Sequence, residues 1–307
     1  MTLDPNQLSF SRPIDEPSVA AETLMLADGR RTLVLRHLPL EPTGLAVVYL
    51  HGIQSHPGWF VGSAAALARA GCDVFQVTRR GSGLAATHRG DAASGTQLLD
   101  DVQSAVDFAR DRSGASRVAV VGVSWGGKLA VAYALTNLDR IESLTLVAPG
   151  IVPRVDVAAA TKAAIAAARL LCPRKYFDIP LNDVSLFSND PAMQQYLRRD
   201  PHRLHRATAR FLASSAGLDR LIARSPDGRL GARTSLLLAR QDRIIDNDAT
   251  RAVMQRLTAG AVRVETLEGA HTLEFEPDPL PFYQALVRAV AGETSAASAS
   301  DNQRRTT

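Results

Sequence analysis

The hexapeptide GVSWGG, residues 122–127, constrains the fold of this chain more than any other stretch of its sequence. It joins the apolar run RVAVVGV, which is typical of a buried strand, to the small-residue run KLAVAYAL, which is typical of a helix. Glycine inside a helix costs about 1 kcal/mol relative to alanine, so glycines at a helix start need a compensating benefit. A sharp turn that lifts Ser124 clear of a sheet supplies that benefit, because Gly122 and Gly126 lack the Cβ atoms that would crowd it. The pattern predicts a strand, a strained turn with an exposed serine, and a helix.

Short apolar runs alternate with helical segments on both sides of this turn. The runs LAVVYLHG, CDVFQVTRRG, RVAVVGVSW and ESLTLVAPG are separated by segments of helical pattern. Runs that are apolar on both faces are what a parallel sheet covered by helices requires. Upstream, ETLMLADGRRTLVLRHL contains two strand patterns joined at Asp28-Gly29, a strong hairpin signal. We therefore expect a doubly wound α/β fold that begins with an antiparallel hairpin.

The alternation stops after Gly150 and resumes at residue 234, which divides the chain. We predict an α/β core over 21–150 and 234–291, with a helical cap inserted at 151–233. The polar ends, 1–20 and 292–307, are predicted to be disordered. The inserted segment carries 14 Lys and Arg against 7 Asp and Glu. This local excess of positive charge is typical of either a solvated surface or a cap that attracts an anionic substrate or lipid headgroups.

Composition excludes several other classes of protein. An apolar content of 46% with 21% charged residues is that of a soluble globular protein. A formal net charge of only +4, and a sequence without a Lys- or Arg-rich run or a known nucleic-acid-binding motif, argue against nucleic-acid binding. No stretch approaches the roughly 18 apolar residues of a membrane span, and the N-terminus lacks a signal-peptide pattern. Cys72 and Cys172 lack metal-ligand spacing and are expected to be free thiols, so we predict a cytoplasmic protein.

A serine nucleophile needs a base, and the base needs an acid to orient it. Downstream of Ser124, His271 in LEGAHTLEF follows a strand pattern, whereas His202 and His205 lie in the arginine-rich insertion, where a surface position is expected. For the acid, Asp242 lies at the end of the strand pattern SLLLARQD. Asp246 follows four residues later and is the weaker candidate, because a residue at a strand end is better fixed.

Backbone amides must also face the charge that develops on the substrate oxygen. The loop HGIQSH follows a predicted strand and presents the Ile53 amide, and the Trp125 amide next to the nucleophile is the second candidate donor. His51 is expected to stabilise the turn. Gln54 and His56 are close in sequence to Ile53, so they are expected either to line the pocket or only to stabilise the loop.

Together, HGIQSHPGW, RRGSG, GVSWGG, ARQDRIID and EGAHTLEF resemble the α/β-hydrolase superfamily, over about residues 20–291. Their spacing is most similar to serine hydrolases of the monoacylglycerol lipase, lysophospholipase and serine aminopeptidase type. The resemblance implies a mostly parallel eight-stranded sheet, a cap after the sixth strand, Asp242 as the acid and His271 as the base. An aspartate often precedes Arg79 in relatives, whereas Thr78 stands there in this chain.

The expected function is hydrolysis of a carboxylic ester through an acyl-enzyme on Ser124, without a metal or organic cofactor. The expected partner is a small-molecule or lipid ester, not nucleic acid, and the basic cap is expected to favour transient contact with a membrane surface. A thioesterase, an acyltransferase or a peptidase would use the same residues, and a non-catalytic binding protein is a more distant alternative. Lys128, on the helix after Ser124, is expected to be a helix-surface cation.

Overall fold

The computed structural model of the chain describes residues 10–11, 18–83, 88–231 and 233–291. The predicted tail at 292–307 lies outside the described residues, as does most of the predicted N-terminal segment 1–20. Within the described residues, no helix is both long enough and apolar enough to cross a membrane.

The core of the molecule is an eight-stranded sheet with the strand order β1-β2-β4-β3-β5-β6-β9-β10. The first two strands run antiparallel to their neighbours, and all the other neighbouring pairs are parallel. The strands are β1 (Val19–Met25), β2 (Arg31–His37), β3 (Leu45–Leu50), β4 (Asp73–Val77), β5 (Arg117–Val123), β6 (Ser143–Val147), β9 (Arg233–Ala239) and β10 (Arg263–Leu267). Every residue of β3, β4 and β6 is buried, which explains why these runs lack a polar face.

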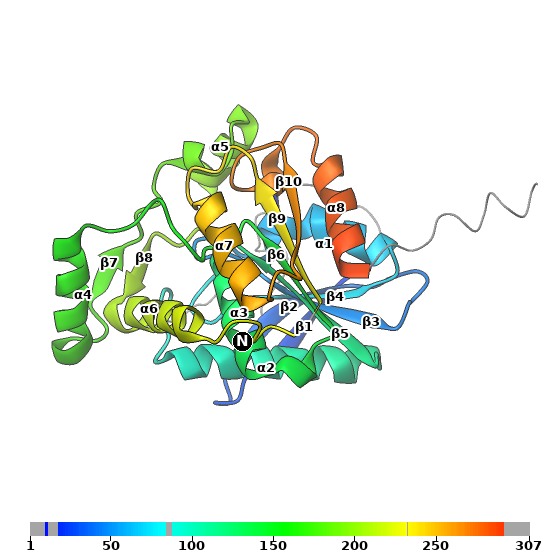
Figure 1. Ribbon diagram of the computed structural model, residues 1–307, viewed down its shortest axis with the longest axis horizontal. Helices are drawn as coiled ribbons and strands as arrows, with labels where there is room; N and C mark the ends of the chain where they lie inside the picture. The colour runs from blue at the N-terminus through cyan, green and yellow to red at the C-terminus, as the bar shows by residue number, and fades with distance from the viewer. Residues whose placement is uncertain (1–9, 12–17, 84–87, 232, 292–307) are drawn as a thin grey trace, which may run out of the picture.

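Helices cover both faces of the sheet (Figure 1). Helices α1 (Val61–Arg69) and α8 (Leu280–Ala291) pack together on one face, and α2 (Gly95–Ser113) and α3 (Trp125–Thr136) pack together on the other. Helix α7 (Asn247–Leu257) follows β9 and contacts it. All the residues of α3 from Trp125 to Leu135 are buried, because this helix lies against the sheet, α2 and the inserted segment. A helix enclosed on all sides needs small apolar residues, as in KLAVAYAL.

The hairpin predicted at Asp28-Gly29 is confirmed. Strands β1 and β2 pair from Val19 opposite His37 to Met25 opposite Arg31. Gly29 adopts a φ of +78°, a conformation that glycine takes without steric cost. The fold is therefore the doubly wound, mostly parallel architecture that the sequence predicted, with an antiparallel start.

The described part of the segment between β6 and β9 holds three α-helices, α4 (Ala159–Leu171), α5 (Pro191–Arg199) and α6 (Ala209–Arg224). We call this segment the cap. It also contains two short strands that the sequence did not predict, β7 (Tyr176–Asp178) and β8 (Arg206–Thr208), which pair antiparallel. Strands of three residues are too short to show an alternating pattern. Figure 1 shows α4, β7, β8 and α6 together at one side of the sheet, with α5 above it.

Candidate active site

The turn between β5 and α3 consists of the single residue Ser124. Its φ of +53° and ψ of −123° are unfavourable for a residue with a side chain. The turn brings backbone segments so close together that two neighbouring positions must be glycine. A Cβ atom on Gly126 would lie 2.6 Å from the carbonyl oxygen of His51, and one on Gly122 would lie 2.7 Å from the carbonyl oxygen of Gly126. The glycines permit a strained conformation that presents the serine at the sheet edge.

Three side chains that lie far apart in the sequence meet at this turn. The Nε2 atom of His271 lies 2.9 Å from Ser124 Oγ, and its Nδ1 atom lies 2.7 Å from Asp242 Oδ2. Asp242 follows β9 and His271 follows β10, so adjacent parallel strands deliver both residues to the same edge of the sheet. The carboxylate accepts the Nδ1–H proton, which leaves Nε2 free to accept the serine hydroxyl proton. This is the hydrogen-bond order that a serine nucleophile requires.

The Asp242 carboxylate is held in its charged form. Burial alone raises the pKa of Asp242, but the charge and hydrogen bond of His271 outweigh that effect, and the net pKa lies below its ordinary value. The amides of Ile244 and Ile245 also donate to Oδ1, at 2.8 and 3.0 Å. A buried carboxylate with these partners is fixed in position and can stabilise a positive imidazole.

The alternative acid and bases lie elsewhere. Asp246 begins helix α7, where its side chain accepts the Ala249 amide proton at 3.0 Å. His202 is half-buried and packs edge-on against His56, and His205 is exposed. The structure therefore brings together Asp242 and His271 with the serine, and none of these three alternatives.

The amides expected to hold a substrate oxyanion line the same cavity as the serine. Ile53, Ser124 and Trp125 all line it. The loop after β3 approaches the serine closely, because a Cβ atom on Gly52 would lie 3.2 Å from Ser124 Cβ. Within the described part of the chain, neither the Ile53 nor the Trp125 amide donates a backbone hydrogen bond. Both amides are therefore free to donate to a ligand.

His51 stabilises this loop, as expected. Its Nε2 atom accepts the Arg79 amide proton at 3.0 Å, so Nδ1 carries the proton and donates to the Gly52 carbonyl at 2.9 Å. Burial, followed by the charge of Arg79, holds the pKa of His51 well below its ordinary value. The neutral ring holds the turn that presents the Ile53 amide.

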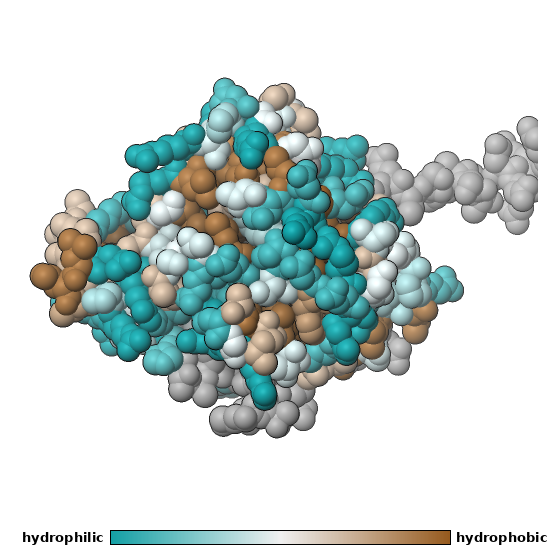
Figure 2. Space-filling model, turned by 90° about the horizontal axis from the view of Figure 1, so that it is seen from below, coloured by the Kyte–Doolittle hydropathy of each residue, from teal (hydrophilic) through white to brown (hydrophobic). Residues whose placement is uncertain are grey.

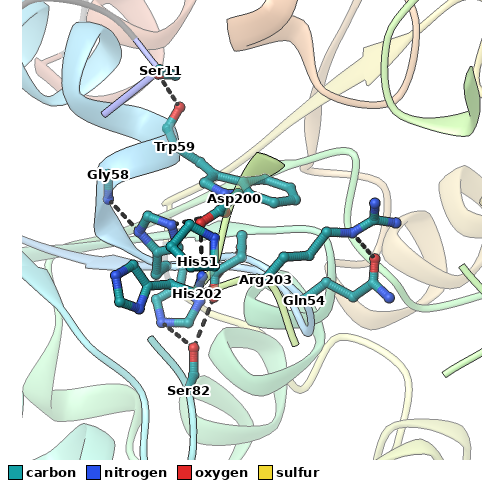
Figure 3. A network of polar contacts seen from close by, with 12 residues as sticks. Ser11, His51, Gln54, Gly58, Trp59, Ser82, Asp200, His202 and Arg203 are labelled. Carbon is teal, nitrogen blue, oxygen red and sulfur yellow. Dashed lines mark hydrogen bonds and ion pairs between the residues drawn. The ribbon is translucent and has the colours of Figure 1, made fainter. Parts of the chain in front are cut away.

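Gln54 and His56 are not among the residues that line the cavity, and both are buried. Figure 3 shows Gln54 beside Arg203 of the cap. His56 Nε2 lies 3.0 Å from Asp200 Oδ2, and Gln54 Oε1 accepts from Arg203 Nε at 3.1 Å. Their side chains contact a cap segment some 150 residues later in the chain. The structure thus assigns them the loop role that the sequence left open, and it adds two cap partners that no motif indicated.

A cavity of about 630 Å³ opens onto Ser124 between the core and the cap. Its walls are mainly apolar and include Val155, Ile165, Ile179, Leu212, Ile244 and Ile245. A pocket of this size, with Ser124 in its lining and mainly apolar walls, suits a small ligand with an apolar chain.

Lys128 lies in the cavity wall, which corrects the prediction of a surface cation. Its side chain is 8% exposed, and its Nζ atom lies 2.7 Å from Asp219 Oδ1. Ser215 Oγ lies 3.5 Å from the same ammonium and accepts the Trp125 indole N–H at 2.8 Å. Both partners belong to α6, whose docking over α3 removes this helix face from solvent. The sequence around α6 contains no motif that could have revealed these contacts.

The fold and the arrangement of this site define an α/β hydrolase. The family model for the serine aminopeptidases, S33, matches residues 41–278, and the chain belongs to this family. No curated protein matches the sequence.

Solved structures share the fold. The monoacylglycerol lipase of Paleococcus ferrophilus is 20% identical with a TM-score of 0.75, and the match covers 85% of this chain and 99% of that one. A soluble variant of the monoglyceride lipase of Saccharomyces cerevisiae, bound to a substrate analogue, is 14% identical with a TM-score of 0.78, covering 92% and 99%. A thermostable carboxyl esterase of Bacillus coagulans, bound to glycerol, is 15% identical with a TM-score of 0.74, covering 90% and 99%. These similarities show a shared α/β-hydrolase fold.

Proposed function

We propose that this hydrolase cleaves carboxylic esters with an apolar acyl chain through an acyl-enzyme on Ser124. The observation that carries the proposal is the position of His271. Its two ring nitrogens lie within hydrogen-bond distance of Asp242 and of Ser124, which lines a mainly apolar cavity. The names of the structurally similar lipases and the esterase support the same class of substrate.

In the proposed reaction, Ser124 Oγ attacks the ester carbonyl carbon while its proton passes to His271 Nε2. The carbonyl oxygen becomes an oxyanion that accepts hydrogen bonds from the Ile53 and Trp125 amides. The intermediate collapses, and the departing alkoxide takes the proton from His271. Water then attacks the acyl-enzyme, with His271 as the base, and releases the carboxylic acid and free serine. Asp242 stabilises the imidazolium at both stages.

The charges around the cavity favour an ester over an amino-terminal peptide. A peptidase that recognises a free α-ammonium needs an unpaired carboxylate in its pocket. Three carboxylates line this cavity, Asp156, Asp178 and Asp219, and each forms an ion pair, with Lys162, Arg206 and Lys128 respectively. The cavity therefore lacks a free acid to bind such a group within the described residues.

The proposal is tested with p-nitrophenyl esters of increasing chain length, together with matched thioesters and aminoacyl amides, on wild type and Ser124→Ala. We expect turnover of the longer esters, loss of at least about a thousandfold in kcat for Ser124→Ala, and labelling of the wild-type serine by a fluorophosphonate. Added alcohol tests for acyl transfer. Preferred cleavage of amides, or ester turnover that survives in Ser124→Ala, would contradict the proposal.

We also propose that α4 contacts an anionic lipid surface. Leu170 and Leu171 at the end of this helix are 83% and 80% exposed, within a cap that carries twice as many basic as acidic residues. Figure 2 shows an apolar patch at the end of the molecule where α4 lies. Leu170 also lines the cavity, so a lipid surface bound here would adjoin the entrance to the serine.

Vesicle co-sedimentation tests this contact. The double variant Leu170→Ser, Leu171→Ser should lose binding to vesicles rich in phosphatidylglycerol and retain turnover of a short soluble ester. Leu40→Ser is the matched control, because Leu40 is 81% exposed in the loop after β2. Equal binding of all three proteins, or equal binding to neutral and anionic vesicles, would exclude the contact.

A further inference from the structure

Arg79 is a buried arginine that contacts both residues of the candidate oxyanion site. It follows β4 and is 7% exposed. Its Nη2 atom donates to the Ile53 carbonyl at 2.9 Å. Its guanidinium lies over the ring of Trp125, 4.9 Å from the centroid, and over the ring of Phe211 in the cap, at 5.0 Å. One side chain thus connects the loop after β3, the start of α3 and the cap.

The charge of Arg79 has no ionic partner in the described residues. Its Nη atoms donate to the neutral carbonyls of Arg80 and Ile53, and its buried Nε atom makes no hydrogen bond. The neighbouring Arg80, by contrast, pairs with Asp28 and Asp101 at 2.7 and 2.6 Å. Burying an unpaired charge is costly, so a fold keeps one only where something offsets that cost.

The guanidinium nevertheless stays protonated at neutral pH. Burial lowers the pKa of Arg79 to about 9, and the charge of Asp101 offsets part of that effect. A positive charge therefore lies against the Ile53 carbonyl and the Trp125 ring while the serine is in its resting state. The rings of Trp125 and Phe211 stabilise this charge in part, because aromatic faces attract cations.

We propose that Arg79 is a positioning residue for the oxyanion of the reaction. Its hydrogen bond fixes the Ile53 residue, its stacking fixes Trp125, and its positive charge next to both residues favours negative charge on the carbonyl oxygen that their amides hold. An interaction that is stronger in the transition state than in the ground state raises kcat rather than substrate affinity. This inference rests on the proposed ester hydrolysis at Ser124.

The test compares Arg79→Met and Arg79→Lys with wild type. Arg36→Met is the matched control, because Arg36 on β2 also stacks on an aromatic ring, Phe75 at 5.0 Å, and also donates to a backbone carbonyl. For Arg79→Met we expect kcat to fall roughly 10- to 100-fold with KM nearly unchanged. Arg79→Lys, which keeps the charge and loses the planar fork, should retain an intermediate kcat. Arg36→Met should lower the melting temperature and leave kcat unchanged.

Inhibition by an alkyl trifluoromethyl ketone distinguishes a role in holding the oxyanion from a purely structural role of Arg79. Ser124 Oγ adds to the carbonyl carbon of the ketone, the proton passes to His271, and the carbonyl oxygen becomes the anion. Arg79→Met should weaken inhibition by this ketone by about the same factor as kcat/KM. Inhibition by the corresponding alkyl alcohol, which forms no oxyanion, should not change.

Equal losses for the ketone and the alcohol, or an effect on melting temperature alone, would overturn the role of Arg79. If Arg79→Met does not fold, the ratio of ketone to alcohol inhibition in Arg79→Lys decides the question in the same way. A wild-type protein that hydrolyses no ester and does not react with a fluorophosphonate would instead contradict the proposed function. The two failures are therefore distinguishable.

Discussion

The indole N–H of Trp59, in the short 3-10 helix Pro57–Phe60 that follows β3, donates a buried hydrogen bond of 2.7 Å to the carboxylate of Asp200 in the cap. The same oxygen accepts from His56 Nε2 at 3.0 Å, and the other oxygen accepts the His202 amide at 2.9 Å. Figure 3 shows this network between the two parts of the chain. The loop that carries Ile53 is thereby fixed to the cap that closes the cavity.

Replacing Asp200 by Asn should destabilise the protein by about 1–3 kcal/mol at neutral pH, because buried donors lose a charged acceptor. Burial alone raises the pKa of Asp200, but its His56 partner outweighs that effect and holds the pKa below the ordinary 3.8. Because the pKa of Asp200 is lower in the folded state than in the unfolded state, this stability is fully present at a pH above the unfolded-state pKa. It is lost as the pH falls through the folded-state pKa.

Thermal melts from pH 7 to 3 should show the melting temperature of the wild type approaching that of Asp200→Asn at the acid end. Asp248→Asn is the control, because Asp248 has a side chain 90% exposed; a constant gap across the pH range would contradict the prediction.

The choice between the two aspartates after β9 can be tested directly. Asp242→Asn should lower kcat about 10⁴-fold, because an amide no longer enforces the tautomer in which Nε2 accepts the serine proton. Asp246→Asn should leave kcat nearly unchanged, since asparagine also begins helices well. Steady-state kinetics on one ester substrate measure both. A larger loss for Asp246→Asn than for Asp242→Asn would reverse the assignment.

Gly126→Ala should abolish folding or destabilise the protein by more than about 3 kcal/mol, because the new methyl group would meet backbone that cannot move without displacing β3. Gly217→Ala is the matched variant, since the nearest atom to a Cβ there is the flexible end of Arg220, at 3.8 Å. Gly217 lies inside α6, where alanine should add up to about 1 kcal/mol of stability. Denaturant unfolding of both variants checks the contrast. Similar effects at the two positions would mean that the turn is not strained.

The two thiols should react at very different rates. Cys172 is exposed, whereas Cys72 is buried and burial raises its pKa to about 11. An aromatic disulfide reagent should therefore label one thiol rapidly in the folded protein and the second only on unfolding. Cys172→Ser should remove the rapid phase. Two rapid phases in the wild type would show that β4 and its neighbours open easily.

The elements predicted best from the sequence are those that depend on neighbouring residues. The hairpin at Asp28-Gly29, the buried parallel strands and the turn at GVSWGG each have a local pattern that few other conformations could satisfy. Strands β7 and β8 were missed because three residues cannot show a period, and they form only when paired with each other. The sequence predicts a surface position for Lys128, because nothing near it in sequence indicates that α6 covers it.

In the candidate site, too, the residues at recognisable sequence patterns could be predicted, whereas contacts with distant segments could not. The sequence singled out Ser124, Asp242 and His271 by their positions after predicted strands, and their catalytic roles stay a proposal that the variants above test. The role of His56 and Gln54 depended on Asp200 and Arg203, some 150 residues later, and could not be read from the loop itself.

The sequence by itself determined the alternation of strands and helices in the core, the tight turn at Ser124 and the candidate residues for the chemistry, because these follow from local geometry and chemical type. Only the tertiary structure decided which charged side chains form ion pairs and which are buried without an ionic partner. It paired Lys128 with Asp219, joined the core to the cap through Asp200, and buried Arg79 beside Ile53 with no carboxylate partner among the residues that the structure describes. Burial and pairing depend on segments distant in the chain, so a local pattern carries no information about them.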